Sequence, residues 1–573
     1  MFNYADHLET PAGSTPQSES LPNQVENSAG GFSFQVDDWQ KLDRFLILGS
    51  EAGSYYATPR ALTRENAKVI ERCLKEDGDR VVKQILQISD AGRAPKNDPA
   101  LFALAMAAKL GDECTRRLAF EALPRVARIG THLFHFAAFL KSIGGWGRAT
   151  KRGFAKWYTD MPEERLVLQA IKYQSRDGWS HRDLLRLAHP MPITDRQKAI
   201  FHWIAKGWSE IGQEPHPDEI LGQIWAFERA KTKPSSKELI RLIVDYHLPH
   251  ECIPTESKNA PAVWSALLPS MGLTALLRNL AKMTNVGIIA PFSVAEKLIL
   301  ERLRDFSAIS KARLHPLRIL TALKTYGQGH GDKGNLSWEP SQRIVDALDE
   351  SFYLAFKAVE PTGKRHLLAL DVSGSMDQSL IAGMNMSARE GSAAMALVTA
   401  NVESESLFVG FAAGNHPSKW RDYKTGIAPL SISPRQRIND VTEYMRKIPM
   451  GGTDCALPML WALQGKIPVD VFCIYTDSET WAGDVHPTEA LKRYRQKMGI
   501  PAKLVVIGMV ANEFSIADPN DGGMLDLVGF DTSCPALIGV FARQGFGRQG
   551  FARQGFDRQG FGQEGFGQED LDR

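Results

Sequence analysis

A run of apolar residues leads directly into a motif that carries three oxygen-bearing side chains. The run HLLAL covers 366–370, and DVSGSM follows at 371–376. A short apolar run that ends in a polar segment with glycine indicates a buried strand that opens into a loop. Asp371, Ser373 and Ser375 alternate, which turns their side chains toward one point. Oxygen ligands at a strand end suit a hard divalent cation, Mg²⁺ above all, so we expect a metal site in the C-terminal third.

Strand and helix patterns alternate on both sides of this motif. The apolar runs rich in Val, Ile and Phe are HLLALDVS (366–373), SLFVGFA (406–412), VDVFCIYTD (469–477) and KLVVIGMV (503–510). Helical segments separate them at 387–402, 434–448 and 487–498. Nearly continuous apolar strands joined by helices predict a doubly wound, mostly parallel sheet covered on both faces. We therefore predict an α/β domain over 364–540.

Two further loops offer oxygen atoms at the same edge of this predicted sheet. Ligands of an open α/β sheet bind beyond the carboxyl ends of its strands. GGTD (451–454) brings Thr453, and TDSET (476–480), after the strand VFCIY, brings Asp477. The alternative is a serine-rich loop without metal, which three matching loops disfavour.

The preceding segment, 32–363, has a helical pattern almost throughout. Apolar residues recur at i, i+3, i+4 and i+7 in 65–76, 79–89, 99–110 and 115–129. The pattern continues for more than 300 residues, beyond the size at which a single core stops growing. This favours an α-solenoid of HEAT-like helix pairs over one compact helical domain.

The two ends of the chain differ in composition from both domains. Residues 1–31 are rich in Ser, Pro, Gly, Asn and Gln, and we expect a disordered leader. Residues 541–570 form six pentads that each begin with Phe, within a tail over 541–573 that we read as disordered low complexity. The pentads are either weakly RNA-adhesive or a neutral repeat expansion.

The charge of the chain is balanced overall but not locally. The formal net charge is only +2, yet 101–200 holds 17 Lys and Arg against 9 Asp and Glu. Such a block is a solvated helix face or an anion-binding surface. Six scattered cysteines without a CxxC pair argue for a reducing compartment. With no apolar leader and no long apolar run, we expect a cytoplasmic protein without a membrane partner.

The densest basic and aromatic stretch is IKYQSRDGWSHRDLLRLAHP at 171–190. On a helix, Lys172 and Arg176 share a face because they are four residues apart. Arg182, Arg186 and His189 share another, at i, i+4 and i+7. Two cationic faces joined by a turn can follow a phosphate backbone. Three rings suited to contact bases lie among them, Tyr173, Trp179 and His181. The alternative is a buried Trp beside solvated charges.

The order of the metal motif resembles the metal-ion-dependent adhesion site of von Willebrand factor A domains. The pattern D-x-S-x-S, a distant Thr and a later Asp are all present over 365–540. The resemblance implies five direct or water-mediated ligands, Asp371, Ser373, Ser375, Thr453 and Asp477. It also implies one open coordination position for a carboxylate of a partner. A metal that activates water is the competing interpretation, but the motif contains no His or Glu general base.

The helical segment resembles the TROVE module of the Ro ribonucleoprotein family. The matching stretches are 45–56, 128–134, 144–149, 179–190, 273–284, 315–331 and 359–373. Together with the A domain, the resemblance covers nearly all of 32–540. It implies that the helical repeats close into a ring. It further implies a small structured Y RNA on the outer basic face and single-stranded ends of misfolded RNA in the central hole.

The same resemblance suggests RNA-binding residues and partners. Lys172, Arg176 and His189 match the family's Y RNA contacts, and weaker candidates for the same surface are Arg148, Lys151 and Arg152. Arg182 and Arg186 are RNA-binding candidates through the helical face that they share with His189. Guesses for the inner wall are Arg278, Lys282 and Arg318. The family implies no enzyme but an RNA quality-control role beside exoribonucleases such as polynucleotide phosphorylase. Two other hypotheses stay open, a metal-dependent adhesion module with a helical scaffold and a metal-dependent ribonuclease.

Overall fold

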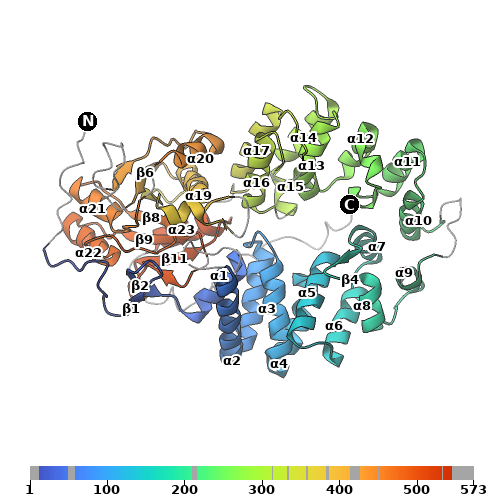
Figure 1. Ribbon diagram of the computed structural model, residues 1–573, viewed down its shortest axis with the longest axis horizontal. Helices are drawn as coiled ribbons and strands as arrows, with labels where there is room; N and C mark the ends of the chain where they lie inside the picture. The colour runs from blue at the N-terminus through green and yellow to red at the C-terminus, as the bar shows by residue number, and fades with distance from the viewer. Residues whose placement is uncertain are drawn as a thin grey trace.

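The structure is a computed structural model that places a helical part beside an α/β domain (Figure 1). The described residues are 12–49, 59–208, 216–312, 314–331, 335–356, 359–381, 386–412, 426–448, 451–510, 512–531 and 533–544, with side chains omitted for 59–67. The predicted fold class is therefore confirmed in both its parts. None of the described helices is long and apolar enough to cross a membrane.

Seventeen helices of the described residues precede the sheet and follow one another around an arc (Figure 1). They are α1 (Asp38–Leu48), α2 (Pro59–Ala91), α3 (Asp98–Leu110), α4 (Glu113–Val126), α5 (Gly130–Ile143), α6 (Arg148–Thr159), α7 (Glu163–Lys172), α8 (His181–Ala188), α9 (Asp195–Lys206), α10 (Glu219–Lys231), α11 (Ser236–Tyr246), α12 (Pro261–Leu267), α13 (Leu273–Asn285), α14 (Val294–Leu303), α15 (Phe306–Lys311), α16 (Pro316–Gly327) and α17 (Gln342–Leu354). The main helix contacts in this part join helices at most three places apart in the series, such as α3 with α5 and α6 with α8, as a stacked arrangement requires.

The predicted helix positions agree with this series apart from one junction. The two patterns predicted at 65–76 and 79–89 join as α2, which is kinked at Asp77 (φ −155°, ψ 89°). Asp112 then caps α4 by accepting from the Thr115 amide. Such caps satisfy the orphan amides of a helix start and explain why the breaks fall where the sequence places polar residues.

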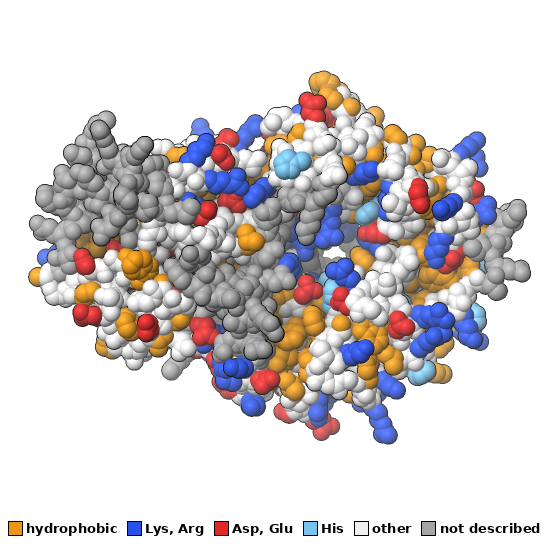
Figure 2. All heavy atoms as spheres, in the orientation of Figure 1, with side chains coloured by type: hydrophobic (Ala, Val, Ile, Leu, Met, Phe, Trp, Pro, Cys, Tyr) orange, Lys and Arg blue, Asp and Glu red, His pale blue; other side chains and the backbone are white. Residues whose placement is uncertain are grey.

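The arc of helices closes on itself where α16 meets the connection between α2 and α3. Arg318 of α16 donates from Nε to the Pro95 carbonyl at 3.0 Å. His315, which caps α16, places Nε2 3.1 Å from the Arg93 carbonyl oxygen. Arg93 in turn pairs with Asp531 of the α/β domain at 3.2 Å. The helical part is thus a closed ring, and Figure 2 shows Lys and Arg side chains at the hollow in its middle.

The α/β domain is built on a six-stranded sheet in the order β11-β9-β8-β5-β6-β7. Its strands are β5 (Arg365–Asp371), β6 (Glu405–Phe411), β7 (Ile427–Pro429), β8 (Val471–Thr476), β9 (Lys503–Gly508) and β11 (Met524–Val528). All neighbours are parallel except β7, a short antiparallel edge strand that the pattern did not predict. The helices of this part are α18 (Gly374–Gln378), α19 (Ala388–Val402), α20 (Ile438–Arg446), α21 (Leu457–Gln464), α22 (Pro487–Met498) and α23 (Ser533–Arg543).

The central position of β5 decides where the sheet can bind a ligand. The chain leaves β5 toward β6 on one side, and β8 pairs with β5 on the other. This is a point at which the strand order reverses, and such points open a crevice at the carboxyl ends of the strands. Asp371 is the last residue of β5 and therefore lies at this crevice.

The predicted disordered leader is wrong for residues 12–31, while 1–11 lie outside the described residues. β1 (Gln24–Glu26) pairs with β2 (Phe32–Gln35), and β2 pairs with β10 (Phe514–Ser515) of the α/β domain. Gln17 is completely buried. The segment is ordered because its amide side chains bond to a loop more than 430 residues away, which local composition does not reveal.

The predicted low-complexity tail also begins later than its repeat suggests. α23 continues to Arg543, and Phe541, the first residue of the first pentad, is buried. The Phe541 ring belongs to the hydrophobic core because α23 continues into the first pentad. Residues 545–573, which include the second and all later pentads, lie outside the described residues.

Candidate nucleic-acid interface and metal site

A basic surface is formed by the exposed face of α6. Arg148, Lys151 and Arg152 are exposed, whereas Phe154 and Trp157 on the opposite face are buried. This separation follows from the helical spacing of the apolar residues. None of the three cations forms an ion pair with a residue that the structure describes. All three remain available to an anionic ligand.

Helix α8 packs against α6 and extends this surface. A capping box starts α8, in which the Ser180 hydroxyl accepts from the Asp183 amide and the Asp183 carboxylate accepts from the Ser180 amide. Leu184 is buried, while Arg182 and Arg186 are exposed one turn apart. Neither arginine pairs with a carboxylate among the described residues. The predicted shared face of these two arginines is therefore present.

The prediction that Lys172 and Arg176 share a helical face is wrong. α7 ends at Lys172, and Arg176 lies in the hairpin formed by β3 (Ser175–Arg176) and β4 (Trp179–Ser180). The turn is Asp177–Gly178, with φ of 52° and 76°. Asp-Gly favours this two-residue turn because both positions need positive φ, and that signal was readable in the sequence.

The two cations consequently differ in availability. The Lys172 ammonium is half-buried and lies 3.6 Å from Glu251 Oε1. The Arg176 guanidinium is exposed, and the one carboxylate paired with it in the described part of the chain is that of Asp177 at 3.7 Å. We therefore expect Arg176 to contribute more than Lys172 to the attraction of a phosphate backbone.

The two histidines of this stretch also have different positions. His189 ends α8 in a left-handed conformation (φ 48°) and is exposed. His181 was expected to contact bases, but it is buried and its Nδ1 lies 2.8 Å from the Tyr158 hydroxyl. Burial lowers the pKa of His181 to about 4, so the ring is neutral near pH 7. The expected base contact by His181 is wrong because Phe134 and Trp157 enclose the ring.

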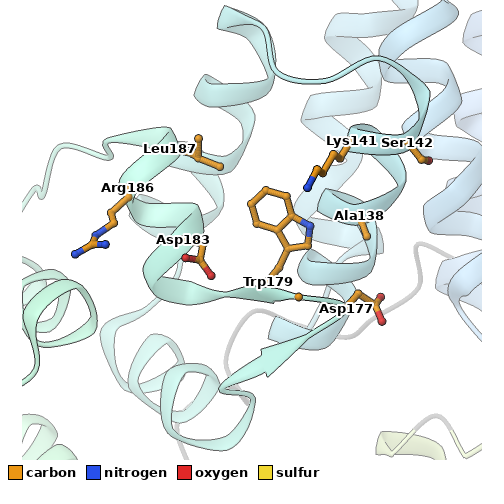
Figure 3. Close-up of a pocket in the computed structure, with 9 residues that line it drawn as sticks. Ala138, Lys141, Ser142, Asp177, Trp179, Asp183, Arg186 and Leu187 are labelled. Carbon is orange, nitrogen blue, oxygen red and sulfur yellow. The ribbon is translucent and has the colours of Figure 1, made fainter.

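A pocket of about 780 Å³ opens between α5, the β3–β4 hairpin and α8. Figure 3 shows the Trp179 ring in it, with Lys141 extending toward the ring from α5 and the α8 side chains on the other side. The lining residues are Ala138, Lys141, Ser142, Asp177, Gly178, Trp179, Asp183, Arg186 and Leu187. Lys141 was not among the predicted residues, because no short motif connects it with the 171–190 stretch.

Four of the five predicted metal ligands lie together at the carboxyl ends of β5 and β8, namely Asp371, Ser373, Ser375 and Asp477. Thr476, the last residue of β8, donates from Oγ1 to Asp371 Oδ2 at 2.6 Å. The Ser373 amide donates to Asp371 Oδ1 at 2.9 Å, and Ser373 Oγ lies 3.0 Å from Ser375 Oγ. Asp477 directly follows Thr476. The parallel pairing of β5 and β8 brings the two aspartates to one edge.

Backbone hydrogen bonds hold the loop that carries Thr453 against the loop that follows β8. The Thr453 carbonyl accepts from the amides of Trp481 and Ala482, both at 3.1 Å. The loop with Thr453 is thus held against the segment that follows Asp477. Asn512, which follows β9 in the chain, also donates to the Asp477 carbonyl and supports this segment. The three loops therefore converge as predicted from their order in the sequence.

The electrostatics of this cluster favour a bound cation. Burial and the charge of Asp477 raise the pKa of Asp371 to about 7. Burial also raises the pKa of Asp477. Among the described side-chain atoms, Asp477 Oδ2 is buried without a hydrogen-bond partner. A buried carboxylate oxygen without a donor is costly, so these residues fit a divalent cation.

The expectation of an open, surface-exposed metal site is not met by this conformation. All five side chains are at most 3% exposed. A further buried residue, Arg389 of α19, donates from Nη2 to the Ser373 carbonyl at 3.4 Å. No sequence signal pointed to Arg389, which stands beside Glu390 at the start of an otherwise uncharged helix. In the described part of the chain, no group of three or more His, Cys, Asp or Glu residues is arranged to hold a metal.

The three residues suggested for the inner wall of the ring also differ in their availability to a ligand. Arg278 is exposed, and Lys282 donates to Asn259 at 2.8 Å. Arg318 instead closes the ring through the Pro95 carbonyl. Its guanidinium is therefore a structural group.

Comparisons with known proteins match both parts of the chain. The family model of the TROVE domain matches residues 25–220 and 241–325, and that of the Ro60 vWA domain matches 365–542. The chain is 42% identical over 532 residues to RNA-binding protein RO60 of Deinococcus radiodurans, covering 92% of this chain and 97% of the relative. It is 36% identical over 592 residues to RNA-binding protein RO60 of Caenorhabditis elegans, covering 90% of each.

A solved structure agrees with the fold as well as with the sequence. The crystal structure of the Deinococcus radiodurans RO (RSR) protein matches with a TM-score of 0.67 and 40% identity, covering 88% of this chain and 99% of the other. The order of a TROVE ring and a vWA domain is thus shared over nearly the whole chain. The chain belongs to the Ro family.

Proposed function

We propose that this protein binds RNA on the basic surface of α6, the β3–β4 hairpin and α8. The observation that carries the proposal is the set of exposed cations without ion pairs to described residues, Arg148, Lys151, Arg152, Arg182 and Arg186. Unpaired cations on neighbouring elements attract a phosphate backbone and release its counterions. The relatives named RNA-binding proteins support the same function.

The RNA that we infer for this surface is a small structured RNA of the Y RNA type. We further propose that single-stranded ends of misfolded RNA enter the central hollow, where Lys and Arg side chains gather (Figure 2). In this role the protein acts without catalysis, in cytoplasmic RNA quality control or as an adaptor for an exoribonuclease such as polynucleotide phosphorylase. The free thiols of its six cysteines support a reducing compartment.

For the α/β domain we propose a resident Mg²⁺ held by Asp371, Ser373, Ser375, Thr453 and Asp477. When bound, the ion supplies positive charge to two buried carboxylates that otherwise repel each other. The burial of all five side chains supports an internal, stabilising ion over an adhesion contact in this conformation. An adhesion module remains the second candidate function, carried by the likeness of the ligand set to adhesion sites.

The test of RNA binding removes two exposed arginines at once. Arg182→Ala with Arg186→Ala should weaken binding of a Y-like stem-loop RNA in a gel-shift titration and lower its dependence on salt. The matched control is Lys492→Ala with Lys497→Ala, which removes two exposed charges from α22 of the α/β domain. Equal affinities for the double variant and the control would contradict the proposed surface.

A further inference from the structure

We propose that the pocket between α5, the β3–β4 hairpin and α8 binds one unpaired nucleobase that carries an exocyclic amino group. The proposal rests on the proposed RNA-binding function and specifies what the surface recognises. The pocket has a volume of about 780 Å³ and Trp179 in its wall (Figure 3). That volume lies within the range of small-molecule sites in proteins.

Trp179 is placed to stack on a base. The ring is half-buried and is supported by Trp146, whose ring centroid is 5.1 Å away at an interplanar angle of 55°. The Lys141 ammonium lies 5.7 Å from the Trp179 ring centroid. Lys141 is exposed and pairs with no carboxylate that the structure describes, so its ammonium can move to a phosphate when a base takes the place beside the ring.

Both cations and carboxylates line the pocket. Lys141 and Arg186 belong to the lining, and so do Asp177 and Asp183. Arg176 is directly opposite Trp179 in the hairpin register and is exposed. The carboxylates disfavour a free anion, whereas a nucleotide can stack its base on Trp179 and place its phosphates near the cations.

Asp183 decides which bases fit. Its Oδ2 accepts from the Ser180 amide at 3.0 Å, which is one bond of the capping box, and also from the Ser180 hydroxyl at 2.6 Å. No donor to its Oδ1 is found among the residues that the structure describes, so this oxygen can accept from a ligand. Adenine, cytosine and guanine carry an amino group that can donate to this oxygen, whereas the corresponding position of uracil is an acceptor. The pocket therefore selects an amino-bearing base over uracil.

The experiment uses the full chain and two single-stranded oligouridylates, one of them with a single central adenine. We expect wild type to bind the adenine oligonucleotide more tightly. Trp179→Ala should weaken this binding by about 5- to 100-fold, and Trp179→Phe should restore most of it because stacking is retained. Trp481→Ala, which removes an exposed Trp of the α/β domain, is the control without effect.

A second pair of measurements tests the base and the stacking separately. Asp183→Asn keeps an acceptor for Ser180 and places an amide NH₂ where Oδ1 stood, so the preference should move from adenine to uracil by about tenfold. The fluorescence of a 2-aminopurine at the centre of the oligouridylate should be quenched by wild type and not by Trp179→Ala. If all variants bind and quench like wild type while wild-type binding stays salt-dependent, the pocket proposal is wrong and the RNA-binding proposal stands. If wild type fails to bind either oligonucleotide or a stem-loop RNA at low salt, both are wrong.

Discussion

Gln17 donates from Nε2 to Asp454 Oδ1 at 2.7 Å, across 437 positions of the chain. The same amide nitrogen donates to the Val485 carbonyl at 2.7 Å, and Oε1 accepts from the Thr480 hydroxyl. Asp454 follows Thr453, one of the proposed ligands. The segment before the ring therefore fastens two of the three metal loops to each other.

Gln17→Ala should destabilise the α/β domain. The substitution removes one hydrogen bond from each of three buried groups, namely Asp454 Oδ1, the Val485 carbonyl and the Thr480 hydroxyl. A buried group left unsatisfied costs about 1–3 kcal/mol. Urea or thermal unfolding should show a lower midpoint than wild type. Gln24→Ala is the matched control, because Gln24 makes a longer bond of 3.3 Å to His486 from a half-exposed position. Equal losses in the two variants would contradict a special role of Gln17.

Mg²⁺ should raise the thermal midpoint of the protein, and Asp371→Asn should abolish that rise. Without metal, the variant should be at least as stable as wild type, because the substitution removes one of two like charges, and burial together with the charge of Asp477 raises the pKa of Asp371 to about 7. Scanning calorimetry in Mg²⁺ and in a chelator measures both effects. Asp440→Asn, at an exposed position of α20, controls for the loss of a surface charge.

The metal prediction would be contradicted by either of two results. One is a wild-type midpoint that does not respond to Mg²⁺. The other is a response that survives in Asp371→Asn, which would place the ion elsewhere.

The ring junction should weaken in acid because His315 must be neutral there. Its Nδ1 accepts from the Leu317 amide at 3.2 Å, and its Nε2 lies 3.1 Å from the Arg93 carbonyl. Burial lowers the pKa of His315 from 6.5 to about 4. A depressed histidine pKa means that the unfolded state binds the proton more tightly, so stability is present above pH 6.5 and is lost as pH falls toward 4.

The size of this effect is at most about 3 kcal/mol from the difference between the two pKa values. The measurement is the unfolding midpoint between pH 8 and pH 4.5. His315→Gln should lower the midpoint at pH 8 and flatten the fall. His181 is buried with a pKa of about 4 too, so the flattening should be partial. An unchanged slope in His315→Gln would contradict the role of His315.

The fold and the metal loops were predictable because both depend on local patterns. An apolar strand that ends in Asp371 has one direction in a parallel sheet, and Thr453 and Asp477 follow from the order of the loops. The leader was not predictable in this way. Gln17 and Asn27 are ordinary polar residues, and only their distant partners, such as the Thr480 carbonyl 2.7 Å from Asn27, make them structural.

In the basic stretch at 171–190, the turn signal decided the local structure and the helical spacing did not. Helical spacing linked Lys172 with Arg176, but Asp177–Gly178 turns the chain between two short strands. The turn decides the structure here, because an i, i+4 pair of like charges does not stabilise a helix. Contact of Lys141 with the Trp179 ring needed the tertiary packing of α5 on the hairpin.

Single substitutions should rank the cations of the RNA-binding surface by their availability. Arg176→Ala removes an exposed guanidinium and should reduce the slope of log affinity against log salt by about one, whereas Lys172→Ala should reduce it less, because Glu251 lies 3.6 Å from the Lys172 ammonium. Glu251→Gln frees Lys172 and should steepen the slope. Titrations of a stem-loop RNA at several salt concentrations measure all three. A larger loss for Lys172→Ala than for Arg176→Ala would mean that RNA displaces Glu251, and Lys172 would then be the principal phosphate contact.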